Sequence, residues 1–155
     1  ASSSGTGTPI MAVRPSANYT LTSSAAIPNT ASVSNTSDTG TYSINNSPAL
    51  LELISNKGVK VINDGVVRID LDFILEITSA NTDVEISIIR ERPEGATQTT
   101  LQSFQRRMPN SANVAIGFSL HAAAVADDVY LFKIHRSAGA GVLKTASSFT
   151  VTKLS

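Results

Sequence analysis

The chain contains no cysteine and no tryptophan, and aromatic residues make up 5% of it. The absence of cysteine excludes disulfide bonds, thiolate metal sites and cysteine nucleophiles together. If the protein must persist outside a cell, another source of stability has to replace disulfides, and self-association is a common one. The shortage of aromatic rings also argues against sugar recognition, which favours stacking platforms.

Charge is sparse as well, and neither sign is in excess. Twelve Lys and Arg residues balance twelve Asp and Glu residues, so the formal net charge is zero. Because no basic patch or run of like charges is visible, we expect no nucleic-acid partner and no membrane partner. No stretch of about 18 apolar residues indicates a transmembrane helix. The N-terminus lacks the basic and apolar regions of a secretory signal, so we expect synthesis in the cytoplasm.

The first 48 residues differ in composition from the rest. They are rich in Ser, Thr, Ala and Asn, and Arg14 and Asp38 are their charged residues. Four prolines interrupt any helix, and the isolated apolar residues show no sustained period. We therefore predict an extended N-terminal arm over residues 1–48 and a folded head over residues 49–155. The arm is expected to lie along another protein surface, and the alternative is packing on its own domain or on a sister subunit.

The clearest pattern lies between Val66 and Thr78. From Val67 to Ile77 every odd position is apolar, whereas the even positions are mostly charged or polar. This alternation is typical of a long, half-buried β-strand. Similar runs follow, separated by turn signals such as Asn63-Asp64-Gly65. The spacing predicts an all-β fold of about eight antiparallel strands after residue 49, in a β-sandwich or barrel.

A second strand has apolar residues on both faces. Tyr130, Phe132 and Ile134 share one parity, and Val129 and Leu131 share the other. A strand that is apolar on both faces is buried on both, whereas one face of a single sandwich should meet water. We therefore predict that Tyr130, Phe132 and Ile134 contact sister subunits. Cover by the N-terminal arm is the alternative.

The candidate catalytic and metal-binding groups favour structural interpretations. Asp70 and Asp72 share one face of a strand and are able in principle to bind calcium or act as acid and base. With Arg68 beside them, we interpret them as part of a solvated or subunit-facing stripe. Likewise, we interpret Asp127 and Asp128 as a turn between strands.

The two histidines, His121 and His135, are not accompanied by a Gly-x-Ser-x-Gly motif. We therefore predict no enzymatic activity, no catalytic residue, no metal site and no cofactor. Four arginines are interpreted as a mixed, solvated surface that could still steer docking to an acidic partner. They are Arg90, Arg92, Arg106 and Arg107.

Residues 50–155 resemble the jelly-roll heads of the tumour-necrosis-factor and complement-head superfamily. A long alternating strand follows the turn glycine Gly65, and Ser148-Phe149-Thr150-Val151 is similar to the superfamily's final strand. Between them, an apolar strand at Phe118 precedes Asp127-Asp128, where the superfamily usually has Gly-Asp. The resemblance implies a jelly-roll fold and a tight homotrimer.

Virion proteins often combine such a head with an N-terminal arm. The arm, which has few charges, and the absence of cysteine resemble capsid decoration (cement) or fibre proteins of bacteriophages. The resemblance implies a homotrimeric structural protein on the capsid surface, made in the host cytoplasm, that binds the major capsid protein or another virion protein. The predicted docking residues are the apolar ones of the arm: Ile10, Met11, Val13, Tyr19, Leu21 and Ile27. The alternative is the receptor- or carbohydrate-binding head of a fibre or tail protein, with sites in loops 79–83, 92–98 and 137–144 or in clefts between subunits.

Overall fold

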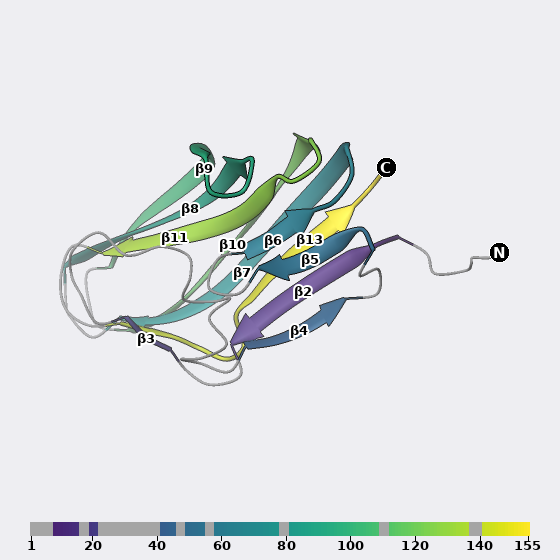
Figure 1. Cartoon of the computed structure of the whole chain (residues 1–155). Coiled ribbons are helices and arrows are strands. Elements are labelled where there is room, and N and C mark those ends of the chain that lie inside the picture. The colour runs from purple at the N-terminus through teal and green to yellow at the C-terminus, as the bar shows by residue number, and fades with distance from the viewer. Residues whose placement is uncertain are drawn as a thin grey trace.

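The computed structural model describes residues 8–15, 19–21, 41–45, 49–54, 58–77, 81–108, 112–136 and 141–155. These residues form two antiparallel sheets that pack face to face (Figure 1). The first sheet contains β2 (Ile10–Pro15), β3 (Tyr19–Leu21), β4 (Thr41–Asn45), β7 (Gly65–Ile77), β10 (Ala112–Ala124), β12 (Gly141–Leu143) and β13 (Ser148–Lys153). The second sheet contains β5 (Leu51–Ile54), β6 (Gly58–Val61), β8 (Thr82–Arg92), β9 (Thr97–Met108) and β11 (Val129–Arg136).

Strand β7 pairs with three other strands of the first sheet. It pairs with β10 over its whole length on one side, and with β13 and then β12 on the other. The second sheet runs in the order β5-β6-β11-β8-β9. Two antiparallel sheets without a helix among the described residues confirm the predicted all-β sandwich. No helix in the described part of the chain is long and apolar enough to cross a membrane.

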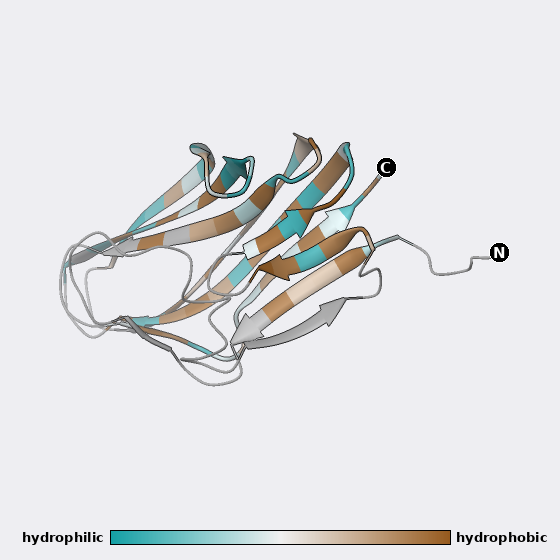
Figure 2. Cartoon of the chain, viewed as in Figure 1, coloured by the Kyte–Doolittle hydropathy of each residue, from teal (hydrophilic) through white to brown (hydrophobic). Residues whose placement is uncertain are grey.

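The alternating sequence of β7 is reproduced in its burial. Each odd residue from Val67 to Ile77 is buried, and the even residues between them are half-buried or exposed. Figure 2 shows such alternation as brown and teal segments along strands like β6. Because successive strand residues point to opposite faces, this one pattern places the apolar row of β7 in the core.

The core lies between the sheets and includes aromatic residues from both. The ring of Phe132 on β11 meets Phe73 on β7 with centroids 4.7 Å apart, and Phe149 on β13 with centroids 5.5 Å apart. Tyr130 and Ile134, on the same face of β11, belong to the same cluster. Burial of this apolar surface is the main force that holds the sheets together.

The predicted subunit contact through Tyr130, Phe132 and Ile134 is corrected by this arrangement. Their exposed fractions are 0%, 2% and 1% within a single chain, so they have no free surface to offer a neighbour. The opposite face of β11 carries a second buried cluster, in which Val129 and Leu131 lie with Ile89. Burial on both faces was predicted, but one chain supplies it without a sister subunit.

The N-terminal segment is also more integrated than an arm over residues 1–48 implies. Strand β2 pairs with β13 and with β4, and the side chains of Met11 and Val13 are buried in the core. In Figure 1 the purple β2 lies alongside the yellow β13. The boundary predicted at residue 48 therefore cuts through the first sheet. The short apolar run at Ile10 showed no sustained period, because a strand of six residues has room for few alternations.

Candidate functional site at the open edge of the sandwich

Strands β9 and β10 end the two sheets on the same side of the sandwich. Within the described ranges, no strand pairs with the outer edge of either one. The ring of Phe104 on β9 stacks on Phe118 of β10, with centroids 6.3 Å apart and planes inclined by 24°. Phe104 is nevertheless 38% exposed. The sandwich thus has an open edge with an aromatic pair at its surface, and long unpaired edges of this kind usually need cover.

An open cleft of about 470 Å³ lies along this edge. Polar side chains from three strands reach it: Arg90 and Arg92 of β8, Gln102 of β9 and His121 of β10. Its apolar walls are formed by Leu101, Leu120 and two alanines. The cleft lies within the size range of small-molecule sites, about 300–1,000 Å³.

The two arginines continue the core-facing row of β8. Val84, Ile86 and Ile88 of this row are core residues, and the next positions of the same parity are Arg90 and Arg92. Strand residues two apart share a face, so both cations lie on the side that elsewhere packs into the core. Such positions are costly for a charge unless a partner neutralises it.

Arg92 has that partner in Asp128, whose side chain is fully buried. The guanidinium donates two hydrogen bonds to the carboxylate, from Nη2 at 2.7 Å and from Nε at 2.8 Å. The amide of Val125 and the hydroxyl of Tyr130 also donate to Asp128, at 2.9 and 3.2 Å. Burial by itself would raise the pKa of Asp128, but these hydrogen bonds outweigh it and hold that pKa below its usual value.

The same network affects Tyr130. Burial, together with the neighbouring Asp128 carboxylate, raises the pKa of the Tyr130 hydroxyl above its usual value. The hydroxyl is therefore a hydrogen-bond donor throughout the range in which proteins are stable. The Asp127-Asp128 segment is a turn between β10 and β11, as predicted, and Asp128 ties that turn to β8.

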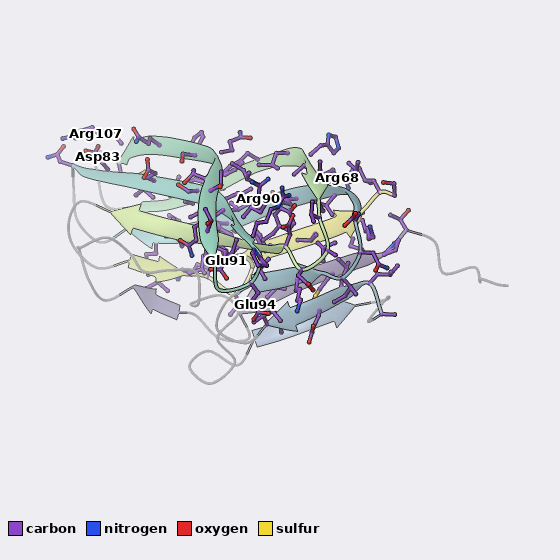
Figure 3. All side chains as sticks on the ribbon, turned by 45° about the horizontal axis from the view of Figure 1, so that its top comes forward. Arg68, Asp83, Arg90, Glu91, Glu94 and Arg107 are labelled. Atoms are coloured by element: carbon purple, nitrogen blue, oxygen red, sulfur yellow. The ribbon has the colours of Figure 1, made fainter. Side chains whose placement is uncertain are left out.

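Arg90 differs from Arg92 in having no such partner. Its Nε is buried and has no hydrogen-bond partner among the described residues. The next residue, Glu91, does not reach it, because Glu91 points to the opposite face of the strand and accepts hydrogen bonds from Gly95 and Gln98. Figure 3 shows Arg90 near the middle of the molecule, with Glu91 and Glu94 toward the turn between β8 and β9.

The outward face of the first sheet carries small side chains along β10. Ala115, Gly117 and Ser119 of β10 are exposed there. A Cβ atom on Gly117 would lie 2.8 Å from Oδ1 of Asp72, so this strand passes close beneath the Asp72 side chain. The carboxylates predicted as a stripe lie on this face, where Asp70 pairs with Arg68 at 3.0 Å. In the described part of the chain, no group of three or more His, Asp or Glu side chains could hold a metal ion.

The structure separates the predicted docking residues. Met11 and Val13 are core residues, which removes them from any docking surface, whereas Ile10 is half-buried. Tyr19 and Leu21 lie in β3, which pairs with β12, and their side chains are not described. Ile27 lies outside the described residues.

The other predicted candidates do not form one site. His121 lines the cleft, but the side chain of His135 is not described. Arg107 pairs with Asp83 at 3.0 Å at the far end of β8 and β9, away from Arg90 (Figure 3). The open edge was missed because β9 is mostly polar in sequence. A signal was available in the sequence of β8, because the alternate positions that are apolar up to Ile88 are occupied by arginine at Arg90 and Arg92.

Comparisons with known proteins find similarity at the level of the fold. No family model matches the chain, and no curated protein matches its sequence. The solved structure of Eiger TNF from S. frugiperda superposes with a TM-score of 0.67 at 16% identity, covering 96% of this chain and 93% of that one. Murine APRIL at pH 5.0 gives a TM-score of 0.67 at 16% identity, covering 95% of this chain and 99% of that one. The chain therefore has a jelly-roll fold of the tumour-necrosis-factor type.

Proposed function

We propose that the protein is a homotrimeric, non-enzymatic structural protein that decorates a bacteriophage capsid. The fold supports the coarser part of this proposal, a jelly-roll head that associates with copies of itself. The role on a virion rests on the composition of the N-terminal segment and on the resemblance of a head with an arm to decoration proteins. The two parts are tested separately.

The observation that carries self-association is a pair of uncovered surfaces on one chain. The first is the open edge, where Phe104 is exposed beside Phe118. The second is the outward face of the first sheet, where the small residues Ala115 and Gly117 are exposed. An exposed ring gains free energy when it leaves water for a closely packed surface, at about 25 cal/mol per Å² of apolar area.

Because the two surfaces differ, they form a head-to-tail contact rather than a symmetric one. Head-to-tail contacts close into rings when the rotation between copies permits, and a ring of three is the assembly that the resemblance implies. Closure would cover the aromatic pair of each copy. It would also supply stability to a chain that has no disulfide.

The particle contact is assigned to the segment between β2 and β4, which contains Tyr19, Leu21 and Ile27. Residues 16–40 are rich in Ser, Thr, Asn and Ala, and Asp38 is their charged residue. Both ends of this segment are anchored in the first sheet by β2 and β4. Three such segments on a trimer would bind a particle with high avidity even if each contact is weak.

The solution mass of the full chain tests self-association. We expect light scattering to give three times 16.2 kDa. The variant Phe104→Glu should give a lower mass, because a charge at the edge is unfavourable in an apolar contact. Leu154→Glu is the control, since Leu154 is also exposed, at 45%, but lies at the chain end. The assignment of the open edge to the subunit contact would be contradicted if the wild-type chain is a monomer at all concentrations. It would also be contradicted if Phe104→Glu leaves the mass of a trimer unchanged.

Co-sedimentation with undecorated phage capsids tests the decoration role. The wild-type chain should saturate the particles, and a variant with residues 22–40 replaced by a Gly-Ser linker of equal length should not. This variant keeps β2, β3 and β4, so circular dichroism should show an unchanged sheet signal. Equal saturation by both proteins would rule out docking through residues 22–40.

A second candidate function is the receptor- or carbohydrate-binding head of a fibre or tail protein. The observation that favours it is the cleft at the open edge, which a pure decoration protein does not need. A glycan array distinguishes the two functions, since a decoration protein should give no saturable signal.

A further inference from the structure

We propose that the cleft between β9 and β10 is a binding site for a small organic monocarboxylate, with Arg90 as the residue that pairs with the carboxylate. The proposal does not depend on the virion role. It rests on three properties of the cleft: a cation without a partner among the described residues, the absence of a lining carboxylate, and apolar walls beside a few polar groups.

The first property is the state of Arg90. This residue follows Ile86 and Ile88 on the core-facing row of β8, and its side chain is half-buried. Its buried Nε has no protein acceptor among the described residues. A guanidinium in such a place has lost part of its hydration without receiving an ion pair in return. An anionic ligand in the cleft, which the Arg90 side chain lines, would supply that ion pair.

The second property is the charge balance within the cleft. Asp128 accepts two hydrogen bonds from Arg92 and neutralises it, and Asp128 itself is buried behind the cleft lining. His121 is exposed and no carboxylate side chain lines the cleft. Because Asp128 neutralises Arg92, the arginine charge that remains uncompensated in the cleft is that of Arg90. This balance matches a monoanion better than doubly charged phosphate or sulfate.

The geometry of arginine points to the same ligand. The planar guanidinium presents two parallel N–H groups that match the two oxygens of a carboxylate. Arg92 and Asp128 form such a two-bond pair next to the cleft. Arg90 carries the same planar fork, and its buried Nε has no acceptor in the described part of the chain.

The third property defines the body of the ligand. Leu101 and Leu120 form apolar walls, and the amide of Gln102 and the imidazole of His121 add hydrogen-bonding groups. A volume of about 470 Å³ accommodates a compact body of one ring. An aromatic acid and an acidic sugar share this chemistry, and the experiment distinguishes between them.

The test is calorimetric titration of the full-length chain at constant ionic strength, so that screening does not change between ligands. Benzoate and N-acetylneuraminate serve as the carboxylate probes. Benzamide and the methyl ester of N-acetylneuraminate are their uncharged counterparts, and inorganic phosphate is the dianion. We expect saturable binding of at least one carboxylate, and weaker binding of its uncharged counterpart and of phosphate. Benzoate alone would identify the aromatic source, and N-acetylneuraminate alone the sugar source.

Two variants of Arg90 locate the site. Arg90→Gln should weaken binding of the active probe about tenfold or more, which corresponds to the loss of one charge-assisted pair. Arg90→Lys keeps the charge but lacks the planar fork, so it should also weaken binding while leaving the fold intact. Arg106→Gln is the matched control, because Arg106 is an exposed arginine on β9 that does not line the cleft. It should bind like the wild-type chain.

Several outcomes would overturn the proposal. These are no binding of either carboxylate, equal binding of an uncharged counterpart, binding of phosphate as tight as that of the carboxylates, or unchanged affinity in Arg90→Lys. The same affinity loss in Arg106→Gln as in Arg90→Gln would show that the effect is general electrostatics rather than a site.

Discussion

At the scale of the residue, the carboxylate of Asp128 joins parts of the chain that are distant in sequence. It accepts hydrogen bonds from Arg92 on β8, from the amide of Val125 and from Tyr130 on β11. Because its pKa is lowered in the folded state, the unfolded chain binds the proton more readily than the folded chain does. The contribution of Asp128 to stability is therefore present above the ordinary carboxyl pKa, near about 4, and is lost as the pH falls through the lower folded-state value.

We expect Asp128→Asn to lower the free energy of unfolding at pH 7 by about 2 kcal/mol, because a buried charge-assisted network is lost. The loss of stability stays moderate because the Arg92 side chain is 37% exposed and can bind water in place of the carboxylate. Urea unfolding at several pH values measures both effects, and the wild-type chain should lose stability more steeply than the variant as the solution becomes acidic. Asp127→Asn is the control, and its 59% exposed side chain should change stability by less than about 0.5 kcal/mol. Parallel acid profiles for all three proteins would contradict this account.

Substitution of Phe132 tests whether this residue belongs to the core of one chain or to a subunit interface. In the structure it contacts Phe73 and Phe149 and is 2% exposed. Phe132→Ala should therefore cost about 3–5 kcal/mol, the usual range for a buried phenylalanine. Urea unfolding measures the loss, and light scattering of the folded fraction shows whether the mass changes. Wild-type stability combined with a smaller mass would restore the subunit contact that the sequence predicted.

At the scale of the element, β2 decides where the N-terminal segment can be shortened. Deletion of residues 1–7 leaves β2 complete, so we expect a soluble protein with an unchanged thermal midpoint. Deletion of residues 1–15 removes Met11 and Val13 from the core, and burial of each is worth about 1.5–3 kcal/mol. It also exposes one edge of β13. Circular dichroism and solubility should show a folded first variant and an unfolded or aggregated second one. A folded, soluble second variant would mean that β2 is dispensable.

The long strands were the elements most accessible to prediction. The alternation from Val67 to Ile77 carried enough repeats to define β7, and β8, β10 and β11 followed in the same way. The C-terminal segment forms β12 and β13, with Ser147 between them. The hydroxyl of Ser147 accepts a hydrogen bond from the amide of Ile74 at 2.9 Å. This backbone amide of β7 therefore keeps a hydrogen-bond partner at the gap between β12 and β13. That break depends on a distant backbone group and left no local signal.

At the scale of the whole molecule, self-association and stability are coupled. If three chains bind one another when folded but not when unfolded, mass action raises the thermal midpoint with protein concentration. We expect this midpoint to rise across a hundredfold range of concentration for the wild-type chain. Phe104→Glu should show a midpoint that does not depend on concentration. Differential scanning calorimetry measures both, and a wild-type midpoint that stays constant would argue against a folded oligomer.

The sequence by itself determined the fold class, because a period of two is a local property that each strand carries in its own residues. It also determined that β11 is buried on both faces, since Tyr130 and Leu131 are both apolar. The tertiary structure decided which surfaces cover those faces, and it assigned both to the same chain. It also brought Arg90, Gln102 and His121 of three strands to one cleft. The physical reason is that register and sheet order depend on the summed packing of distant segments, which alternation within one strand does not encode.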